Sequence, residues 1–311
     1  YARHVGGIAG RLSGTVEKAY NTGNIYNGFN VVGGITGYWY TGDMKNVFNT
    51  GNITVINNNN GTSNVGGIAG VAYIGSGAET HLTNAYNLGS LRSFKGRGDN
   101  KLGGIIGCVS NFSSSSDKLT ISNVYTGGNL YVDSGNLNAV IGGYNNTSLS
   151  SYVSTNNAYY IRPAANNGYT NITNPNATAI DFNSKYDKSK YNGFDFSSQT
   201  EGTISVGEGK QLEDTWRMVD GSGLPILNAF LPGSHDYFSQ QENWNKFKDN
   251  NAQGNVVYGT AYDPMLTIIN SQKDLTFNWT DMNLKNSGAL AVFGVCGAKP
   301  DLTLNDVHIT N

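Results

Sequence analysis

Short apolar segments recur along this chain, and a pair of glycines interrupts each of them. Val5-Gly-Gly-Ile-Ala-Gly10 returns in nearly the same form three times, and a worn copy follows at Ala139-Val-Ile-Gly-Gly143. The full copies begin at residues 5, 32, 65 and 102, so the intervals are 27, 33 and 37 residues. Repeats of this period are typical of solenoids, in which each unit buries its apolar side against the next.

A second motif in each unit places an aromatic residue, an asparagine, a glycine and an aliphatic residue at fixed positions. Its first copy is Ala19-Tyr-Asn-Thr-Gly-Asn-Ile25, and a last trace survives at Asn157-Ala-Tyr-Tyr-Ile161. Stacked units place like residues about 4.8 Å apart, so we expect one continuous aromatic stack inside the solenoid and a ladder of asparagines. The aromatic positions are Tyr20, Phe48, Tyr86 and Tyr125; the asparagines are Asn21, Asn49 and Asn87; the glycines are Gly23, Gly51, Gly89 and Gly128.

Strands account for these units better than helices. The repeats are rich in Gly, Asn, Thr and Tyr, and their apolar residues lack helical spacing. Val5 and Ile8 are three residues apart, so one flat strand cannot point both inward, whereas a bend at the glycine pair can. We therefore expect a unit of strand, glycine corner, strand, loop and strand, and a right-handed parallel β-helix with loop excursions and one short helix.

Unit length varies in two stretches only, between the two motifs and between one unit and the next. Insertions of this kind collect in loops that leave a stacked core. The expected loops include Tyr38-Trp39-Tyr40 and Arg97-Gly98-Asp99.

The pattern divides the chain into three parts. Residues 1–161 contain the repeats, and residues 162–232 form a polar, irregular excursion that ends in an apolar segment, Trp216 to Phe230, which we expect to close the array. In residues 233–311 we expect a short helix at 235–250 and then further β-helix coils that are cut off at the C-terminus.

Composition excludes several classes of protein. Only 14% of the 311 residues are charged and the net charge is −2, so the basic footprint of a nucleic-acid-binding protein is missing. No run of 18 apolar residues predicts a membrane span. Cys108 and Cys296 are far apart in sequence, and we expect two separate, buried thiols.

The paired motifs, Asn-x-Tyr-Asn-x-Gly-x-Ile and Val-Gly-Gly-Ile-x-Gly, resemble the GLUG repeat over residues 5 to about 161. GLUG repeats occur in large bacterial surface proteins, among them filamentous-haemagglutinin-like exoproteins, autotransporter adhesins and some IgA-directed peptidases. The resemblance implies a secreted segment at the outer-membrane surface, a β-helix, and attachment to a host-cell receptor, a glycan or another bacterial cell, as in virulence or biofilm formation. It carries no catalytic residues over.

The motifs supply no enzymatic chemistry. The four histidines, His4, His81, His235 and His308, form no His-Glu-x-x-His pattern, and no zinc, calcium or phosphate motif is present. We therefore expect no enzyme activity, no metal and no cofactor, in a monomeric adhesin segment acting as stalk, as ligand-binding surface or as both. The alternative is a carbohydrate-active or peptidase-associated β-helix module, which an exposed cleft lined by carboxylates would favour.

Two segments are candidate ligand-binding sites. Arg97-Gly98-Asp99 presents an Arg and an Asp around a glycine, as integrin ligands do, although a three-residue match in a glycine-rich chain also arises by chance. In Tyr38-Trp39-Tyr40, strand alternation sends Trp39 opposite to its neighbours, so at least one aromatic side chain is expected to face a sugar or a protein partner. The other interpretation is that these aromatic residues pack beneath a neighbouring loop.

Overall fold

The structure is a computed structural model. Contacts divide the chain into two compact units, Tyr1–Ser184 and Lys185–Asn311, which are described separately. The residues that the structure describes are 3–27, 30–57, 61–75, 79–94, 100–111, 118–162, 177–196, 199–200, 203–204, 216–218, 223–230, 255–257, 268–270, 275–278, 294–296 and 302–305.

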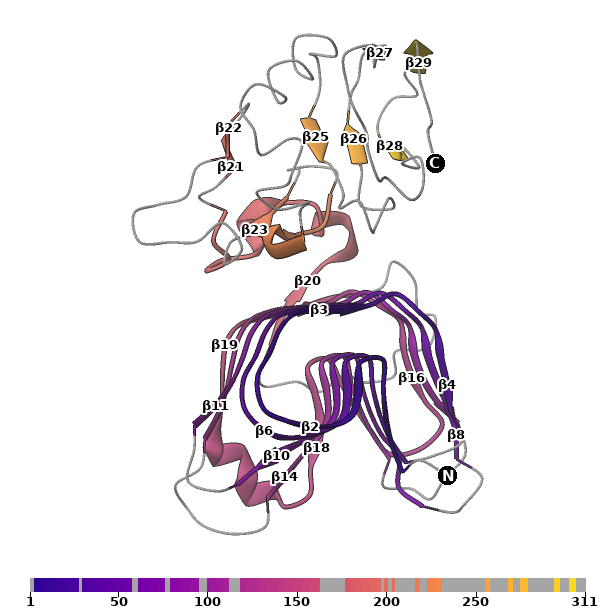
Figure 1. The fold of residues 1–311 in the computed structure, drawn as a ribbon, viewed down its shortest axis with the longest axis vertical. Helices are drawn as coiled ribbons and strands as arrows, with labels where there is room; N and C mark the ends of the chain where they lie inside the picture. The colour runs from indigo at the N-terminus through magenta and orange to yellow at the C-terminus, as the bar shows by residue number, and fades with distance from the viewer. Residues whose placement is uncertain are drawn as a thin grey trace. The chain divides into compact units, whose positions relative to one another are not determined.

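The first unit is a parallel β-solenoid, seen nearly end-on in Figure 1. Successive coils contribute one strand each to four sheets. The first sheet contains β1 (His4–Gly6), β5 (Val31–Gly33), β9 (Asn64–Gly66), β13 (Lys101–Gly103) and β17 (Asn136–Asn138). The second contains β2 (Ala9–Ser13), β6 (Thr36–Thr41), β10 (Ala69–Ile74), β14 (Ile106–Asn111) and β18 (Ile141–Tyr144).

The other two sheets complete each coil. The third sheet contains β3 (Val16–Asn21), β7 (Met44–Asn49), β11 (Glu79–Asn87), β15 (Lys118–Thr126), β19 (Val153–Ile161) and β20 (Thr178–Ile180). The fourth contains β4 (Ile25–Asn27), β8 (Ile53–Ile56), β12 (Leu91–Phe94) and β16 (Leu130–Val132). The prediction of a parallel β-helix is confirmed, but a full coil has four strands rather than three, because the aliphatic residue that ends the second motif begins a strand of its own.

The aromatic positions form the predicted stack. Ring centroids are 5.0 Å apart for Tyr20 and Phe48, 4.7 Å for Phe48 and Tyr86, and 5.3 Å for Tyr86 and Tyr125. Tyr159 continues the same register beside Tyr125. The predicted burial is confirmed, since Phe48, Tyr86 and Tyr125 are at most 1% exposed. The residue before each aromatic enters the larger apolar cluster, so alternation places the stack on the opposite face of the third sheet.

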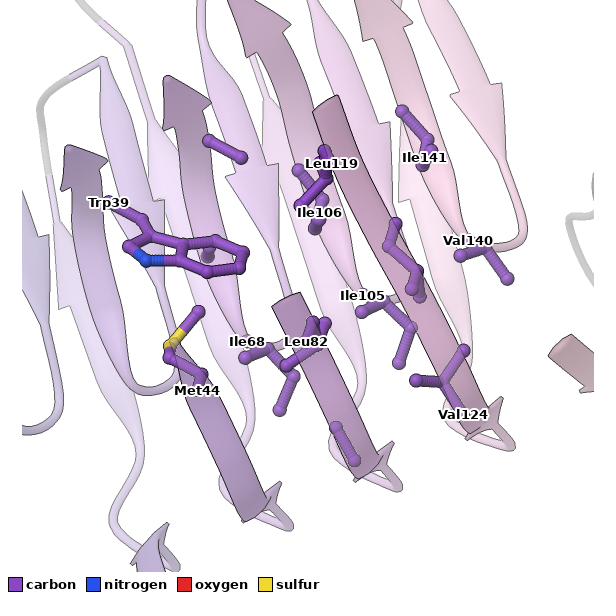
Figure 2. Close-up of a cluster of buried hydrophobic side chains, with 14 of the residues drawn as sticks. Trp39, Met44, Ile68, Leu82, Ile105, Ile106, Leu119, Val124, Val140 and Ile141 are labelled. Carbon is purple, nitrogen blue, oxygen red and sulfur yellow. The ribbon is translucent and has the colours of Figure 1, made fainter. Parts of the chain in front are cut away.

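The glycine corner points into the interior of each coil, between the first and second sheets (Figure 1). Its two flanking aliphatic residues therefore enter different apolar clusters. Val32 and its equivalents pack against Ile53 of the fourth sheet, whereas Ile35 and its equivalents pack against Val47 of the third sheet. The prediction that both residues point inward is confirmed, but they enter two compartments rather than one core. Figure 2 shows the larger compartment.

The asparagine ladder separates the two compartments. Asn21 Nδ2 donates to Asn49 Oδ1 at 2.7 Å, and Asn49 Nδ2 donates to Asn87 Oδ1 at 2.7 Å. Each asparagine lies directly against the glycine corner of its coil; a Cβ on Gly34 would lie 2.6 Å from Asn49 Cγ. Glycine is required here because the corner backbone approaches the ladder too closely for any side chain. The corner and the ladder together form the partition.

A second asparagine row turns the third sheet through a bend. Asn46, Asn84, Asn123 and Asn157 have φ between 52° and 56°, and Lys18 takes the same left-handed conformation in the first coil. The side-chain amides bond along the row, from Asn84 to Asn46 at 3.1 Å, from Asn123 to Asn84 at 3.1 Å, and from Asn157 to Asn123 at 2.8 Å. Asparagine is the residue other than glycine that tolerates this conformation best.

The remaining described elements are short. The first unit also contains 3₁₀ helices at Thr147–Tyr152 and Phe182–Ser184. In the first unit, β20 pairs with β19 and extends the third sheet beyond the last coil. In the second unit, Trp216–Arg217 (β23) and Ile226–Leu227 (β24) form an antiparallel pair. The helix expected at 235–250 lies outside the described residues. The other described elements of the second unit are the 3₁₀ helices Lys188–Lys190 and Asn228–Phe230, and the strands β21 (Gln199–Thr200), β22 (Thr203–Ile204), β25 (Asn255–Val257), β26 (Ile268–Asn270), β27 (Leu275–Asn278), β28 (Gly294–Cys296) and β29 (Leu302–Asn305).

Candidate ligand-binding surface

The segment Tyr38-Trp39-Tyr40 lies in the middle of β6, so its predicted position in a loop is wrong. β6 pairs in parallel with both β2 and β10 through these residues, so the segment belongs to the stacked second sheet. Alternation along the strand then decides which side chain faces which way. Trp39 lies on one face of the second sheet, and Tyr38 and Tyr40 lie on the other.

Trp39 is a core residue. Its side chain is 1% exposed, packs near Met44 and Ile68 (Figure 2), and donates its indole N–H to the Gly42 carbonyl at 2.8 Å. A buried indole needs such an acceptor, because an unpaired N–H in an apolar cluster is costly. Trp39 therefore supports the surface from beneath and is not itself exposed on it.

Four side chains on the outer face of the second sheet, together with His4 of the first sheet, form what we call the aromatic surface. The four are Arg11, Tyr38, Tyr40 and Tyr73. The rings of Tyr40 and Tyr73 stack with centroids 4.9 Å apart, and Tyr38 lies 6.4 Å from Tyr40 and 6.1 Å from Tyr73. His4 comes from the first sheet and lies 4.9 Å from Tyr38. Arg11 Cζ lies 4.6 Å from the centroid of the Tyr40 ring. Tyr38 and Tyr40 are half-buried and Arg11 is exposed, so solvent reaches this group.

The electrostatic field at the aromatic surface is positive. Partial burial, and then the charges of Arg11 and Arg3, lower the pKa of His4. Burial, followed by the neighbouring Tyr73, raises the pKa of Tyr38, and Arg11 opposes that rise. Among the described residues no carboxylate lies within ion-pair distance of Arg11. Within the described ranges the Arg11 guanidinium is therefore held by an aromatic ring rather than by an acid.

A second polar cluster lies on the third sheet. His81 Nδ1 is 3.2 Å from Asp43 Oδ1, and His81 Nε2 is 3.7 Å from Glu79 Oε1. Both ring nitrogens of His81 therefore face carboxylates of the protein itself. A general base needs one nitrogen directed at the substrate, so this geometry is that of a surface charge cluster. Within the described ranges no group of three or more His, Cys, Asp and Glu is arranged to hold a metal ion.

Cys108 is a free, fully buried thiol on the second sheet. Its Sγ lies 3.1 Å from Asn145 Oδ1, and burial raises its pKa to about 11. The expectation of a buried, unpaired thiol is confirmed for Cys108, while the side chain of Cys296 lies outside the described residues. A thiol with this pKa is protonated at neutral pH and is a poor nucleophile.

The other predicted binding segment, Arg97-Gly98-Asp99, lies outside the described residues. The structure instead adds His4, Arg11 and Tyr73 to the predicted site. A signal for two of them is present in the sequence, because Arg11 and Tyr38 each lie six residues after the first valine of their motif, and Tyr40 and Tyr73 each lie eight residues after it. Aligning the coils by the motif therefore places these side chains on one face, next to one another.

Comparison with known proteins gave no match among protein-family models, curated sequences or solved structures. The fold and the geometry of the aromatic surface are therefore the basis for a functional proposal. Over the part of the chain that the structure describes, no helix is long and apolar enough to cross a membrane.

Proposed function

We propose that this chain is a non-catalytic adhesion segment of a secreted protein held at the bacterial cell surface. It attaches to a host-cell receptor, a glycan or another bacterial cell. The observation that carries the proposal is the aromatic surface, where Tyr38, Tyr40 and Tyr73 gather beside the exposed Arg11. Tyrosine and arginine are the residue types that contribute most to binding at protein surfaces.

The architecture supports this function because it separates stability from binding. The interior positions are occupied by the two apolar clusters and the asparagine ladder. The outward positions of the second sheet do not have to match the next coil, as Arg11, Tyr38 and Val71 at one register position show, so their chemistry varies freely. A solenoid therefore presents side chains on a rigid surface at a fixed spacing, which suits attachment better than catalysis. The resemblance of the motifs to GLUG repeats supports the extracellular location.

An attachment assay with the full chain tests the proposal. Fluorescent beads coated with the protein are counted on cultured epithelial cells and on bacterial cells. Replacing Tyr38 and Tyr40 together by alanine is expected to reduce attachment about tenfold or more, the effect of losing binding hot spots. The matched control is Tyr26→Ala, which removes a tyrosine that is 73% exposed on the fourth sheet.

Circular dichroism must show that the double variant keeps its β structure and melts within a few degrees of the parent. Attachment equal to the parent in a folded double variant contradicts the assignment of this surface. A parallel variant with alanine at Arg97 and Asp99 tests the other predicted segment in the same assay.

The alternative function is a carbohydrate-active or peptidase-associated module. Among the described residues, the cluster of Asp43, Glu79 and His81 is the place to test it, because it brings two carboxylates and an imidazole together. Incubating the full chain with polysaccharides and immunoglobulin A tests it. Turnover that disappears in His81→Gln supports the enzyme and rejects the non-catalytic proposal.

A further inference from the structure

Arg11 is oriented as a receptor for a planar anion. Its guanidinium lies over the Tyr40 ring, with Cζ 4.6 Å from the centroid, so one face of the group is covered by the ring. Stacking of this kind restricts the side chain but leaves the N–H donors at the rim of the guanidinium available. Those donors form a fork that matches the two oxygens of a carboxylate.

No described residue supplies this carboxylate. Among the described residues Arg11 has no ion pair. The pKa of His4 is lowered by burial and then by the charges of Arg11 and Arg3, and no described carboxylate opposes this shift. Positive charge therefore gathers at this end of the aromatic surface in a chain whose net charge is −2. Local charge of one sign without an internal partner indicates a ligand of the opposite sign.

The groups beside Arg11 define the rest of the ligand. Tyr38 and Tyr40 are half-buried, and each presents part of an aromatic ring and a phenol hydroxyl. Pyranose rings combine C–H faces with hydroxyls, and this combination is complementary to tyrosine. A purely apolar ligand would leave both Arg11 and the phenol hydroxyls without partners.

We infer that the aromatic surface binds an acidic saccharide, whose carboxylate pairs with Arg11 and whose sugar ring lies against Tyr38 and Tyr40. This inference rests on the proposed function, because it names the ligand class of the same surface. It assigns the specificity for acid to Arg11 and the contact area to the tyrosines.

Binding of small acidic saccharides to the full chain tests the inference. The probes are 3′-sialyllactose and trigalacturonate, each measured by isothermal titration beside a matched neutral sugar, lactose and the carboxyl-reduced trisaccharide. The acidic sugars are expected to bind at least about tenfold more tightly than the neutral ones, the effect of a charge-assisted hydrogen-bonded pair. Binding should weaken when sodium chloride is raised, because Arg11 is exposed.

Three variants separate the roles of charge, geometry and fold. Arg11→Gln is expected to lose the preference for acidic sugars, and Arg11→Lys, which keeps the charge without the fork, is expected to recover only part of it. Arg92→Gln is the control, because it removes an exposed arginine from the fourth sheet and should leave binding unchanged.

Several results overturn the inference. These are equal binding of the acidic and neutral sugars, binding by Arg11→Gln within twofold of the parent, preference for a sulfated sugar over both carboxylated probes, and no binding of any probe. The attachment assay on the same variants keeps the two proposals distinct. Attachment lost with the tyrosines but kept in Arg11→Gln rejects the acidic saccharide and retains the adhesion surface.

Discussion

Successive coils approach each other closely at the glycine position of the second motif. Replacing this glycine by alanine in different coils measures how much the stability of the solenoid depends on that close approach. Gly23, Gly51 and Gly89 occupy the same position in the first three coils. A Cβ on Gly89 would lie 2.7 Å from the carbonyl carbon of Gly51, 2.8 Å from Asn49 Nδ2, and closer still to the Gly51 oxygen. A Cβ on Gly23 would meet only Asn21 Oδ1, at 3.5 Å. None of the three has a left-handed φ, so only space distinguishes them.

The cost of the alanine follows from these distances. An ordinary contact begins at about 3.4 Å, so the backbone of the third coil must move by at least 3.4 − 2.7 = 0.7 Å at Gly89. Two inter-coil hydrogen bonds flank this point, from Leu88 N to Asn49 O at 2.8 Å and from Ile53 N to Ser90 O at 2.9 Å. The same displacement stretches them to 3.5 Å or more. Overpacking costs about 1–3 kcal/mol, and each weakened buried bond adds about 1 kcal/mol.

Gly89→Ala is therefore expected to destabilise the solenoid by about 3 kcal/mol or more. Gly23→Ala should be neutral or stabilise it by up to about 1 kcal/mol, because alanine lowers the conformational entropy of the unfolded chain. Gly51→Ala should fall between them, because it is in conflict only with the first coil, which can separate from the stack. Urea unfolding of the full chain, followed by circular dichroism, measures these differences as shifts of about 1 M or more in the midpoint of the β-sheet transition. Midpoints for Gly89→Ala and Gly23→Ala within about 0.2 M of each other would refute this account of coil contact.

Three further predictions concern other parts of the first unit. Tyr86 is 0% exposed, so Tyr86→Ala should cost about 3–5 kcal/mol, and thermal unfolding within a degree of the parent would show that it is not a core residue. Cys108, whose pKa is raised from 9.0 to about 11, should react with iodoacetamide at pH 8 about a hundredfold more slowly in the folded protein than in urea, as measured on its own peptide by mass spectrometry. In the first coil Ile8 is 53% exposed whereas its equivalent Ile68 is 0% exposed, so amides of β2 should exchange with deuterium faster than those of β10, and equal rates would contradict fraying from this edge.

The register of the solenoid was predictable because the motif carries it. Each coil repeats the valine before the glycine pair and the aromatic after it, and the strands pair with these residues directly opposite one another, as with Val5 and Val32 or Tyr20 and Phe48. Identical side chains gain most when they lie next to their own copies. The aromatic stack and the asparagine ladder follow from that register without further assumptions.

The division of the interior was not predictable from the motif alone. The corner bends inward only because Gly34 and its equivalents leave room for the asparagine ladder, a contact between residues 15 apart in the sequence. The placement of the aromatic stack on the face opposite the larger apolar cluster depends on the bend at Asn46 and its equivalents, where one left-handed residue shifts the alternation of the strand. A count of apolar spacing does not detect such a shift.

The candidate site was predictable only in part, for a related reason. Trp39 and its two tyrosine neighbours stand out as one dense segment, so sequence inspection finds them. Arg11 and Tyr73 are isolated within their own coils, and each becomes part of the site only through its contact with Tyr40 of the neighbouring coil. A binding surface on a solenoid can combine residues from several coils. A motif within a single segment, such as Arg97-Gly98-Asp99, is only one of the ways in which such a surface can form.

The contrast between inward and outward positions of the second sheet explains why such a surface arises there. The position of Trp39 is occupied by Leu12, Ala72 and Val109 in the neighbouring coils, all apolar and facing the core. The outward position one residue before it holds Arg11, Tyr38, Val71, Cys108 and Gly143 in successive coils. Five different side chains at one register position show that stacking restricts the residue type less on the outer face of the second sheet than in the interior. Val71 and Cys108 are buried, whereas Arg11 is exposed and Tyr38 is half-buried, so the low cost of substitution applies to the first two coils. There an aromatic ring from one coil and a cation from its neighbour can be combined into a site while the fold beneath them is unchanged.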